Sequence, residues 1–139
     1  MSLFRIGDRH LDYKQRYFNG DDLKGLAVYS TDNEKSGYVV DVLIDETDTV
    51  AYLVLSVGSG LATWFGDRKK VVLPSAYYAH NQIEKRISVR HLSQARIKAL
   101  PAYETHQHLD EGYETTLRQT TRELEADAGI GALAGATGR

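Results

Sequence analysis

Residues 37–45 read GYVVDVLID, and residues 50–57 read VAYLVLSV. Both stretches are short and rich in β-branched and aromatic residues, which is typical of strands. Successive side chains of a strand point to opposite faces, so the first stretch predicts one wholly apolar face and one mixed face. The apolar face, which we expect to line the core, comprises Tyr38, Val40, Val42 and Ile44. The mixed face comprises Val39, Asp41, Leu43 and Asp45.

The stretch 50–57 is apolar on both faces, so its outer face needs a cover. The chain offers a short helix for this purpose in residues 94–100, with Ser93 as N-cap and Pro101 as the stop. We expect that helix to lie over the outer face as a lid. A second helix is predicted over 110–128, capped by Asp110 and with the favourable charges of Glu111 and Glu114 in its first turn. Its apolar stripe is thin, which is more typical of a solvent-exposed surface helix than of a coiled coil.

Further short β-prone runs at 26–29, 71–73, 77–78 and 86–89 are separated by turn residues. Many short strands with regular turns indicate an all-β sandwich or barrel. The sequence therefore predicts a mainly β fold, a small six-stranded barrel with C-terminal helical segments. We expect an N-terminal arm over 1–25 with about one helical turn, the barrel with its closing helix over 26–103, and a helix with a flexible glycine-rich tail over 104–139.

Composition limits the classes of function. The chain has 139 residues, enough for one domain, and its net charge of −2 leaves 17 basic residues almost balanced by 19 acidic ones. Cysteine is absent, which excludes disulfides, thiolate nucleophiles and cysteine-based metal sites. Neither a signal peptide nor a membrane-spanning apolar run is apparent. We therefore expect a cytoplasmic protein without membrane insertion.

The strand pattern carries a family resemblance. Residues 26–45, with a first strand, a polar turn and then Gly37-x-Val39-x-Asp41-x-Leu43-x-Asp45, resemble the opening of the PRC-barrel family. Residues 51–58 and 70–74 are similar to the third and fourth strands of that family, and the arm and the segment 93–103 resemble stand-alone cyanobacterial members. In the turn after Thr47, where the family commonly has glycine, this chain has Asp48-Thr49. Aspartate also tolerates the left-handed conformation, so we expect the hairpin to persist.

The resemblance implies a compact barrel that serves as a docking element rather than as an enzyme. Relatives include the cytoplasmic domain of the photosynthetic reaction-centre H subunit and a ribosome maturation factor. Fold alone does not transmit function, so neither role passes to this chain residue by residue. A role related to photosynthesis is an expectation from the resemblance only.

Catalytic and cofactor patterns are weak. His106 and His108 could chelate an ion from one side of an extended segment, but a structural zinc site needs four ligands, so we predict no metal and no cofactor. Gly58-Ser59-Gly60 follows a strand without a following helix start, which disfavours phosphate binding. Asp41 and Asp45 share a face about 13 Å apart, too far for an acid and base pair. We therefore predict no catalytic residues.

Two surfaces are candidates for contact with a partner. The loop between Gly58 and Asp67 carries Leu61, Trp64 and Phe65, which either anchor a partner or fold back to plug the barrel. A basic patch is the other candidate, and it would be formed by Arg68, Lys69, Lys70, Lys85 and Arg86.

The leading hypothesis is a non-catalytic protein-interaction or adaptor module with an unspecified protein partner. The alternative is an RNA- or ribosome-assembly factor that uses the basic patch. A ligand inside the barrel is disfavoured because bulky side chains should fill a small barrel. Self-association into a homo-oligomer stays open.

Overall fold

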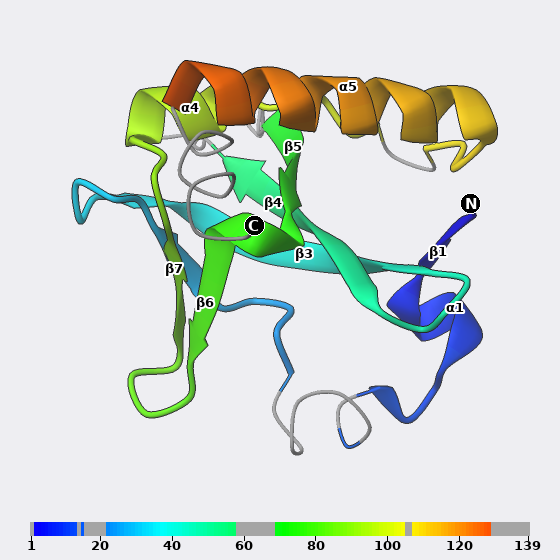
Figure 1. Cartoon of the computed structure of the whole chain (residues 1–139). Helices are drawn as coiled ribbons and strands as arrows, with labels where there is room; N and C mark the ends of the chain where they lie inside the picture. Colours follow the sequence, from blue (N-terminus) through cyan, green and yellow to red (C-terminus); the bar gives the residue numbers. More distant parts are fainter. Residues whose placement is uncertain (1, 14, 16–21, 58–68, 105–106, 129–139) are drawn as a thin grey trace, which may run out of the picture.

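The computed structural model describes residues 2–13, 15, 22–57, 69–104 and 107–128 (Figure 1). Within these residues, seven strands form one sheet. The strands are β1 (Leu3–Arg5), β2 (Ala27–Tyr29), β3 (Lys35–Asp45), β4 (Val50–Val57), β5 (Lys69–Pro74), β6 (Tyr78–Asn81) and β7 (Arg86–Val89). The other elements are helix α1 (Ile6–Arg9), the 3-10 turn η1 (Ser75–Tyr77), and helices α4 (Gln94–Lys98) and α5 (Glu111–Ala128).

The sheet is ordered β5-β4-β3-β2-β7-β6, and β1 pairs with β3. All neighbouring strands are antiparallel except β2 and β7, which are parallel. The fold is mainly β with a C-terminal helix, as predicted, but it has seven strands instead of six. The additional strand comes from the N-terminal arm, where a run of three residues is too short to show alternation in the sequence. Within the described part of the chain, β5 and β6 do not pair with each other, so closure of the barrel is not seen.

The two faces of β3 do not follow simple alternation. Val39 is opposite Leu55 and Asp41 is opposite Val54, so Val40 is an extra residue that forms a β-bulge. A bulge shifts the side-chain alternation by one position. The prediction that Val40 lines the core together with Val42 was therefore wrong, because the face changes between them.

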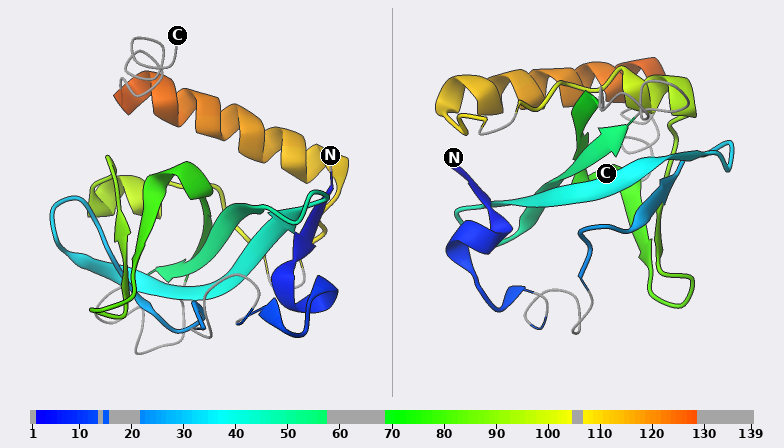
Figure 2. Two further views of the ribbon diagram at one scale, coloured as in Figure 1. Left: turned by 60° about the horizontal axis from the view of Figure 1, so that its bottom comes forward. Right: turned by 180° about the vertical axis from the view of Figure 1, so that it is seen from behind.

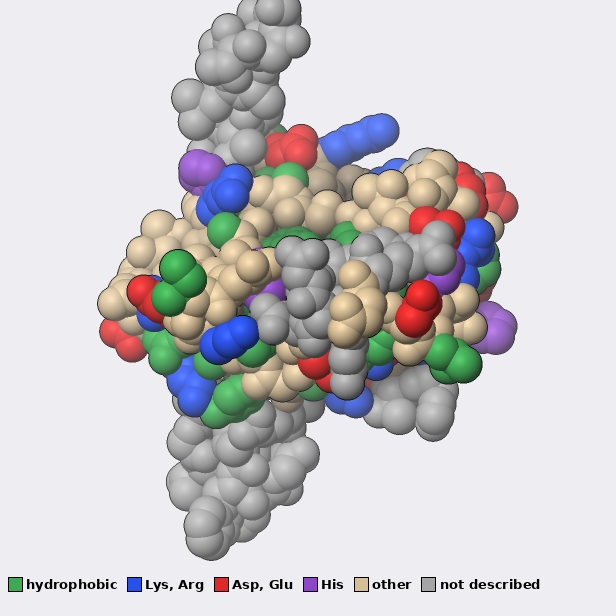
Figure 3. All heavy atoms as spheres, turned by 90° about the horizontal axis from the view of Figure 1, so that it is seen from below, with side chains coloured by type: hydrophobic (Ala, Val, Ile, Leu, Met, Phe, Trp, Pro, Cys, Tyr) green, Lys and Arg blue, Asp and Glu red, His purple; other side chains and the backbone are tan. Residues whose placement is uncertain are grey.

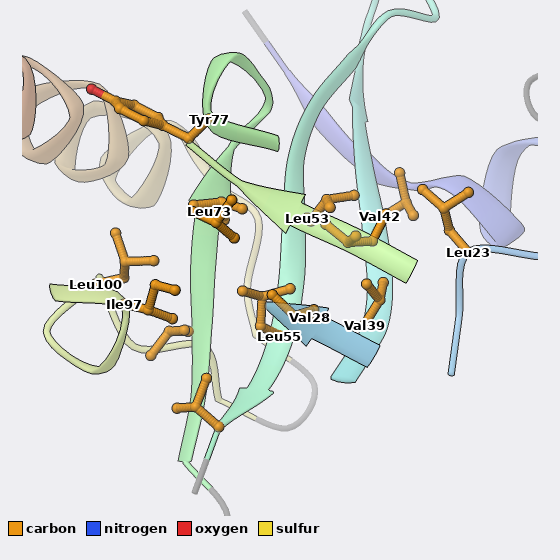
Figure 4. Packing of buried hydrophobic residues seen from close by; sticks show 14 of the residues in the cluster. Leu23, Val28, Val39, Val42, Leu53, Leu55, Leu73, Tyr77, Ile97 and Leu100 are labelled. Carbon is orange, nitrogen blue, oxygen red and sulfur yellow. The ribbon is translucent and has the colours of Figure 1, made fainter. Parts of the chain in front are cut away.

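One side of the sheet encloses a large apolar core, the inner cluster (Figure 4). It comprises Ile6, Tyr13, Leu23, Val28, Val39, Val42, Ile44, Leu53, Leu55, Val57, Val71, Leu73, Tyr77, Ile87, Val89, Leu92, Ile97 and Leu100. Helix α4 contributes Ile97, and Ser93 caps it by accepting a hydrogen bond from the backbone N–H of Arg96. The predicted helix and its cap are confirmed, but its position is not the predicted one. It packs on the inner cluster, whereas we expected it to cover the outer face of β4.

The outer face of β4 is covered by α5, which crosses above the sheet in Figures 1 and 2. The outer cluster beneath it comprises Leu3, Leu43, Tyr52, Val54, Val72, Tyr103 and Leu117. Helix α5 begins as predicted, because the Asp110 carboxylate accepts a hydrogen bond from the N–H of Tyr113 at 2.8 Å. Most described residues of α5 are exposed, as expected for a surface helix, and its thin stripe buries Leu117 against the outer cluster. No helix in the described residues is both long and apolar enough to span a bilayer.

Two positions of the family-like segment, one in β3 and one in the following turn, have clear physical causes. A Cβ atom at Gly37 would collide with the backbone carbonyl of Ser56 on β4, so the close approach of β3 and β4 requires glycine there. Asp48, in the turn between β3 and β4, has a φ of 62°. Its carboxylate pairs with Arg9 at 2.8 Å and with His10 at 2.9 Å. The aspartate thus adopts the left-handed conformation, as predicted, and also holds α1 against the turn.

Candidate functional site

The interior of the sheet offers little room for a ligand, because the inner cluster fills it with aliphatic and aromatic side chains (Figure 4). Contacts with other molecules should therefore be made on the outside. Two outer features stand out in the structure: an open strand edge at β6 and a cavity beneath α5.

The two edge strands of the sheet differ in their backbone partners. On β5, the N–H of Val72 donates to the carbonyl of Pro101 at 3.0 Å, and the carbonyl of Lys70 accepts from the N–H of Tyr103 at 2.9 Å. The segment after α4 therefore covers the β5 edge. Strand β6 pairs with β7 on one side, and no other described strand pairs with its second side. On this second side, every second residue of β6 directs its N–H and C=O groups away from β7.

The β6–β7 hairpin adds an apolar contact beside this edge. It extends away from α5 in Figure 1. Ile83, in the turn, is 94% exposed. Ala79 and Ser88 lie opposite each other on the two strands, and these small side chains help to line a hollow of about 480 Å³ that also includes Ile83. The edge, the hollow and the exposed isoleucine together form what we call the β6 edge site.

The second feature is a cavity of about 490 Å³ between α5 and the sheet. Leu3, Val50, Ala51, Tyr52, Pro74 and Ala76 supply its apolar wall, and Glu114, Arg118 and Arg122 reach it from α5. Burial raises the pKa of the Tyr52 hydroxyl. A hydrogen bond to Thr121 opposes this shift, the charge of Glu114 adds to it and that of Arg118 opposes it. The pKa of Tyr52 therefore depends on the charges of two side chains of α5, Glu114 and Arg118.

Glu114 is the unusual residue of this cavity. Its side chain is only 2% exposed, yet neither carboxylate oxygen has a hydrogen-bond partner among the described residues. A buried carboxylate is costly unless it is paired. Sequence reasoning interpreted Glu114 only as a favourable charge in the first turn of the helix. The available signal was its spacing, because Glu114 precedes the stripe residue Leu117 by three positions and so shares its face.

The expected contact residues of the long loop, Leu61, Trp64 and Phe65, lie outside the described residues, as does Arg68. The rest of the expected basic patch is divided between two elements. Lys69 and Lys70 open β5, and the Lys69 ammonium donates to the carbonyl of Lys98 at 2.9 Å. Lys85 lies in the turn before β7, a strand that is not a neighbour of β5.

Arg86, the last member of the expected patch, is engaged within the hairpin. Its guanidinium pairs with Glu84 at 2.9 Å and lies over the ring of Tyr29. On the face drawn in Figure 3, basic side chains are interspersed with acidic ones.

Metal ligands do not gather in the described ranges, where no group of three or more histidine, cysteine or acidic side chains is suited to hold an ion. Of the two histidines that suggested a site, His106 lies outside those ranges and His108 is exposed. The prediction that the protein binds no metal therefore stays a prediction.

The strand order and the motif at residues 37–45 agree with a comparison of the sequence with family models. Residues 16–94, more than half of the chain, match the model of the PRC-barrel domain. The chain belongs to the PRC-barrel family. The match begins in the N-terminal arm and ends at the start of α4, so α5 lies beyond the part of this PRC-barrel protein that matches the family model, whereas the sheet wall of the cavity beneath α5 lies mostly within it. No curated protein matches the chain.

Proposed function

We propose that this PRC-barrel protein is a non-catalytic adaptor that binds an extended segment of a partner protein at the β6 edge site. The observation that carries the proposal is the contrast between the two sheet edges. The segment 101–103 covers β5, whereas the second side of β6 has no paired strand in the described part of the chain. An open edge binds an added strand through main-chain hydrogen bonds, and nearby pockets select its side chains.

The chemistry of the hairpin supports a protein partner. Transfer of an exposed isoleucine from water into an interface contributes about 1.5 to 3 kcal/mol, and Ile83 is almost fully exposed. Each added main-chain hydrogen bond contributes about 1 kcal/mol more. A four-residue strand therefore supports a modest affinity, which suits an adaptor whose contacts are reversible. Isoleucine on a strand edge offers little to an RNA phosphate.

Affinity capture from native lysate tests the proposal, with a matched pair of surface variants. Ile83→Asp should abolish capture of the protein partner. Leu11→Asp changes an equally exposed leucine, at 97%, and should capture the partner as the wild type does. Once the partner is purified, hydrogen exchange should show that those amides of β6 that point away from β7 become protected on binding.

Three results would contradict the proposal. Ile83→Asp could capture the partner as well as the wild type does. Capture could disappear after nuclease treatment, which would favour the RNA alternative and the basic residues of β5 and the hairpin. Trp64→Ala could abolish capture while Ile83→Asp does not, which would assign the contact to the Gly58–Asp67 loop.

A further inference from the structure

We infer that the cavity beneath α5 is a binding site for a guanidinium group, with Glu114 as its acceptor. This site is separate from the β6 edge site and does not depend on it. Its lining comes from β1, the β3–β4 turn, β4, β5, η1 and α5.

The first step of the argument is the state of Glu114. Its carboxylate is buried beside the outer cluster, and neither oxygen has a hydrogen-bond partner among the described residues. The position in the first turn of α5 favours a negative charge through the helix dipole, but it supplies no hydrogen bond to the oxygens. A native fold that buries such a group generally satisfies it in some other way, and a bound ligand is one way.

The second step is the choice of ligand group. Both carboxylate oxygens lack a partner, and a planar guanidinium donates two parallel hydrogen bonds to one carboxylate. An ammonium would act as a point charge and would match only part of this arrangement. The acidic side chains lining the cavity are Asp45, Glu114 and Glu125 and the basic ones are Arg118 and Arg122, so acidic groups exceed basic ones by one. A single added cation balances them.

The third step is space. A cavity of about 490 Å³ lies within the range of small-molecule sites and is large enough for an arginine-sized group. Val50, Tyr52 and Pro74 provide an apolar wall along which the methylene stem of such a ligand can lie. Thr121, also on the wall, is hydrogen-bonded to Tyr52. The cavity thus offers apolar contacts for the stem, and the head reaches the Glu114 carboxylate, whose oxygens are covered in this structure, once that side chain turns toward the cavity.

The experiment compares two probes of nearly equal shape, n-butylguanidinium and the neutral n-butylurea, by isothermal titration calorimetry and by amide chemical shifts of the full chain. The cation should bind, with shifts concentrated at Tyr52, Glu114 and Thr121, and the urea should bind at least about tenfold more weakly. Equal binding of the two probes, or binding of neither, would overturn the inference.

Two variants locate the acceptor. Glu114→Gln should weaken binding of n-butylguanidinium by about tenfold to a hundredfold, the range for loss of a charge-assisted hydrogen bond. Glu111→Gln, at an exposed position in the same helical turn, should leave the affinity unchanged. Backbone amide shifts of Glu114→Gln recorded without ligand identify a variant that has lost its fold. If Glu114→Gln has lost its fold, Glu114→Met is tested in its place, because methionine suits the apolar surroundings. The same loss of binding is expected for Glu114→Met. Unchanged affinity in a folded Glu114 variant would contradict the assignment.

A third probe distinguishes the sources of the guanidinium. Nα-acetyl-arginine-methylamide carries the same head on a peptide backbone. Tighter binding of this compound than of n-butylguanidinium would indicate an arginine side chain of a protein as the natural occupant. The reverse order would indicate a free small guanidine. Failure of all three probes would remove this site and leave the proposal for β6 intact.

Discussion

Strand β4 presents apolar side chains on both faces, yet the two faces are buried in different ways. Leu53 and Leu55 enter the inner cluster, which consists of apolar residues from the sheet, the arm and the segment before and within α4. Tyr52 and Val54 enter the outer cluster, whose lid is a single helix. Close packing of aliphatic groups specifies one fold, whereas the helix-covered face retains a cavity and a buried carboxylate. Departures from ideal packing are expected where a protein binds something.

Helix α5 is held by few apolar contacts. Leu117 is its one fully buried apolar residue among those whose side chains are described, and Tyr113 and Leu124 are partly buried. The Tyr113 hydroxyl donates to the carbonyl of Ala102 at 2.9 Å. Since a fully buried leucine contributes about 1.5 to 3 kcal/mol, we expect changes beneath α5 to affect stability less than changes in the inner cluster.

The largest effect should come from a carboxylate in the inner cluster. Val42→Asp buries an unpaired charge among apolar side chains and should leave the chain unfolded at 25 °C, because this cost is comparable with the whole stability of a domain. Val40, the bulge residue itself, is only half-buried, so Val40→Asp should stay folded with reduced stability. Circular dichroism and thermal melting compare the two. Unfolding of both variants would restore the simple alternation of β3, which places Val40 and Val42 on one core face.

The next effect compares leucines of the two clusters. Leu53→Ala should lower the free energy of unfolding by about 4 kcal/mol, because the surrounding strands cannot collapse into the cavity that it creates. Leu117→Ala should lower it by only about 2 kcal/mol, since α5 can settle toward the sheet. Urea denaturation measures both values. A larger loss for Leu117→Ala would show that α5 is as integral to the fold as the sheet is.

Much of this comparison could be predicted from the sequence, and the missing parts have definite causes. Runs of β-branched residues located six strands, and Ser93 and Asp110 located two helix starts, because propensity and capping act within a few residues. The bulge at Val40 could not be predicted, because it depends on pairing with β4. It could not be predicted either that α5, rather than α4, covers the outer face of β4. Both helices carry short apolar stripes, and where each one docks depends on surfaces that are distant in the sequence.

The candidate sites were harder to predict than the fold. An open edge is a property of strand order, so nothing within residues 78–81 distinguishes β6 from a central strand. Glu114 is at a favourable position for a charge near a helix start; its spacing from Leu117 places it on the apolar face, but its full burial depends on how α5 packs on the sheet. Lys70 lies on β5 and Lys85 lies beside β7, which are not neighbouring strands, because the position of charges in the sequence does not fix which strands are neighbours.

Alanine in place of glycine should act with opposite signs in the two regions. Gly37→Ala directs a methyl group at the carbonyl of Ser56 and should destabilise the protein by about 3 kcal/mol, because the backbones of β3 and β4 must separate. Gly112→Ala adds a methyl group in the first turn of α5, where the nearest atom is 3.5 Å away, and should stabilise by about 0.5 to 1 kcal/mol. Thermal melting of the two variants gives the signs directly. A neutral Gly37→Ala would mean that β3 and β4 approach less closely than described.

The smallest effect should be a loss of stability at low pH, which arises at the turn between β3 and β4. A hydrogen bond with His10, with help from the charge of Arg9, holds the pKa of Asp48 below its ordinary value of 3.8. The folded state therefore resists protonation of Asp48 more than the unfolded state does. Its contribution to stability is present above pH 3.8 and is lost as the pH falls through the lower, folded pKa.

Asp48→Asn keeps a residue that tolerates a positive φ, so it removes the charge with little backbone strain. Melting temperatures from pH 6 to pH 2.5 should fall less steeply for Asp48→Asn than for the wild type, whereas Asp12→Asn, at an exposed position of the arm, should follow the wild type. Parallel curves for Asp48→Asn and the wild type would show that the contact of Asp48 with α1 does not contribute to stability.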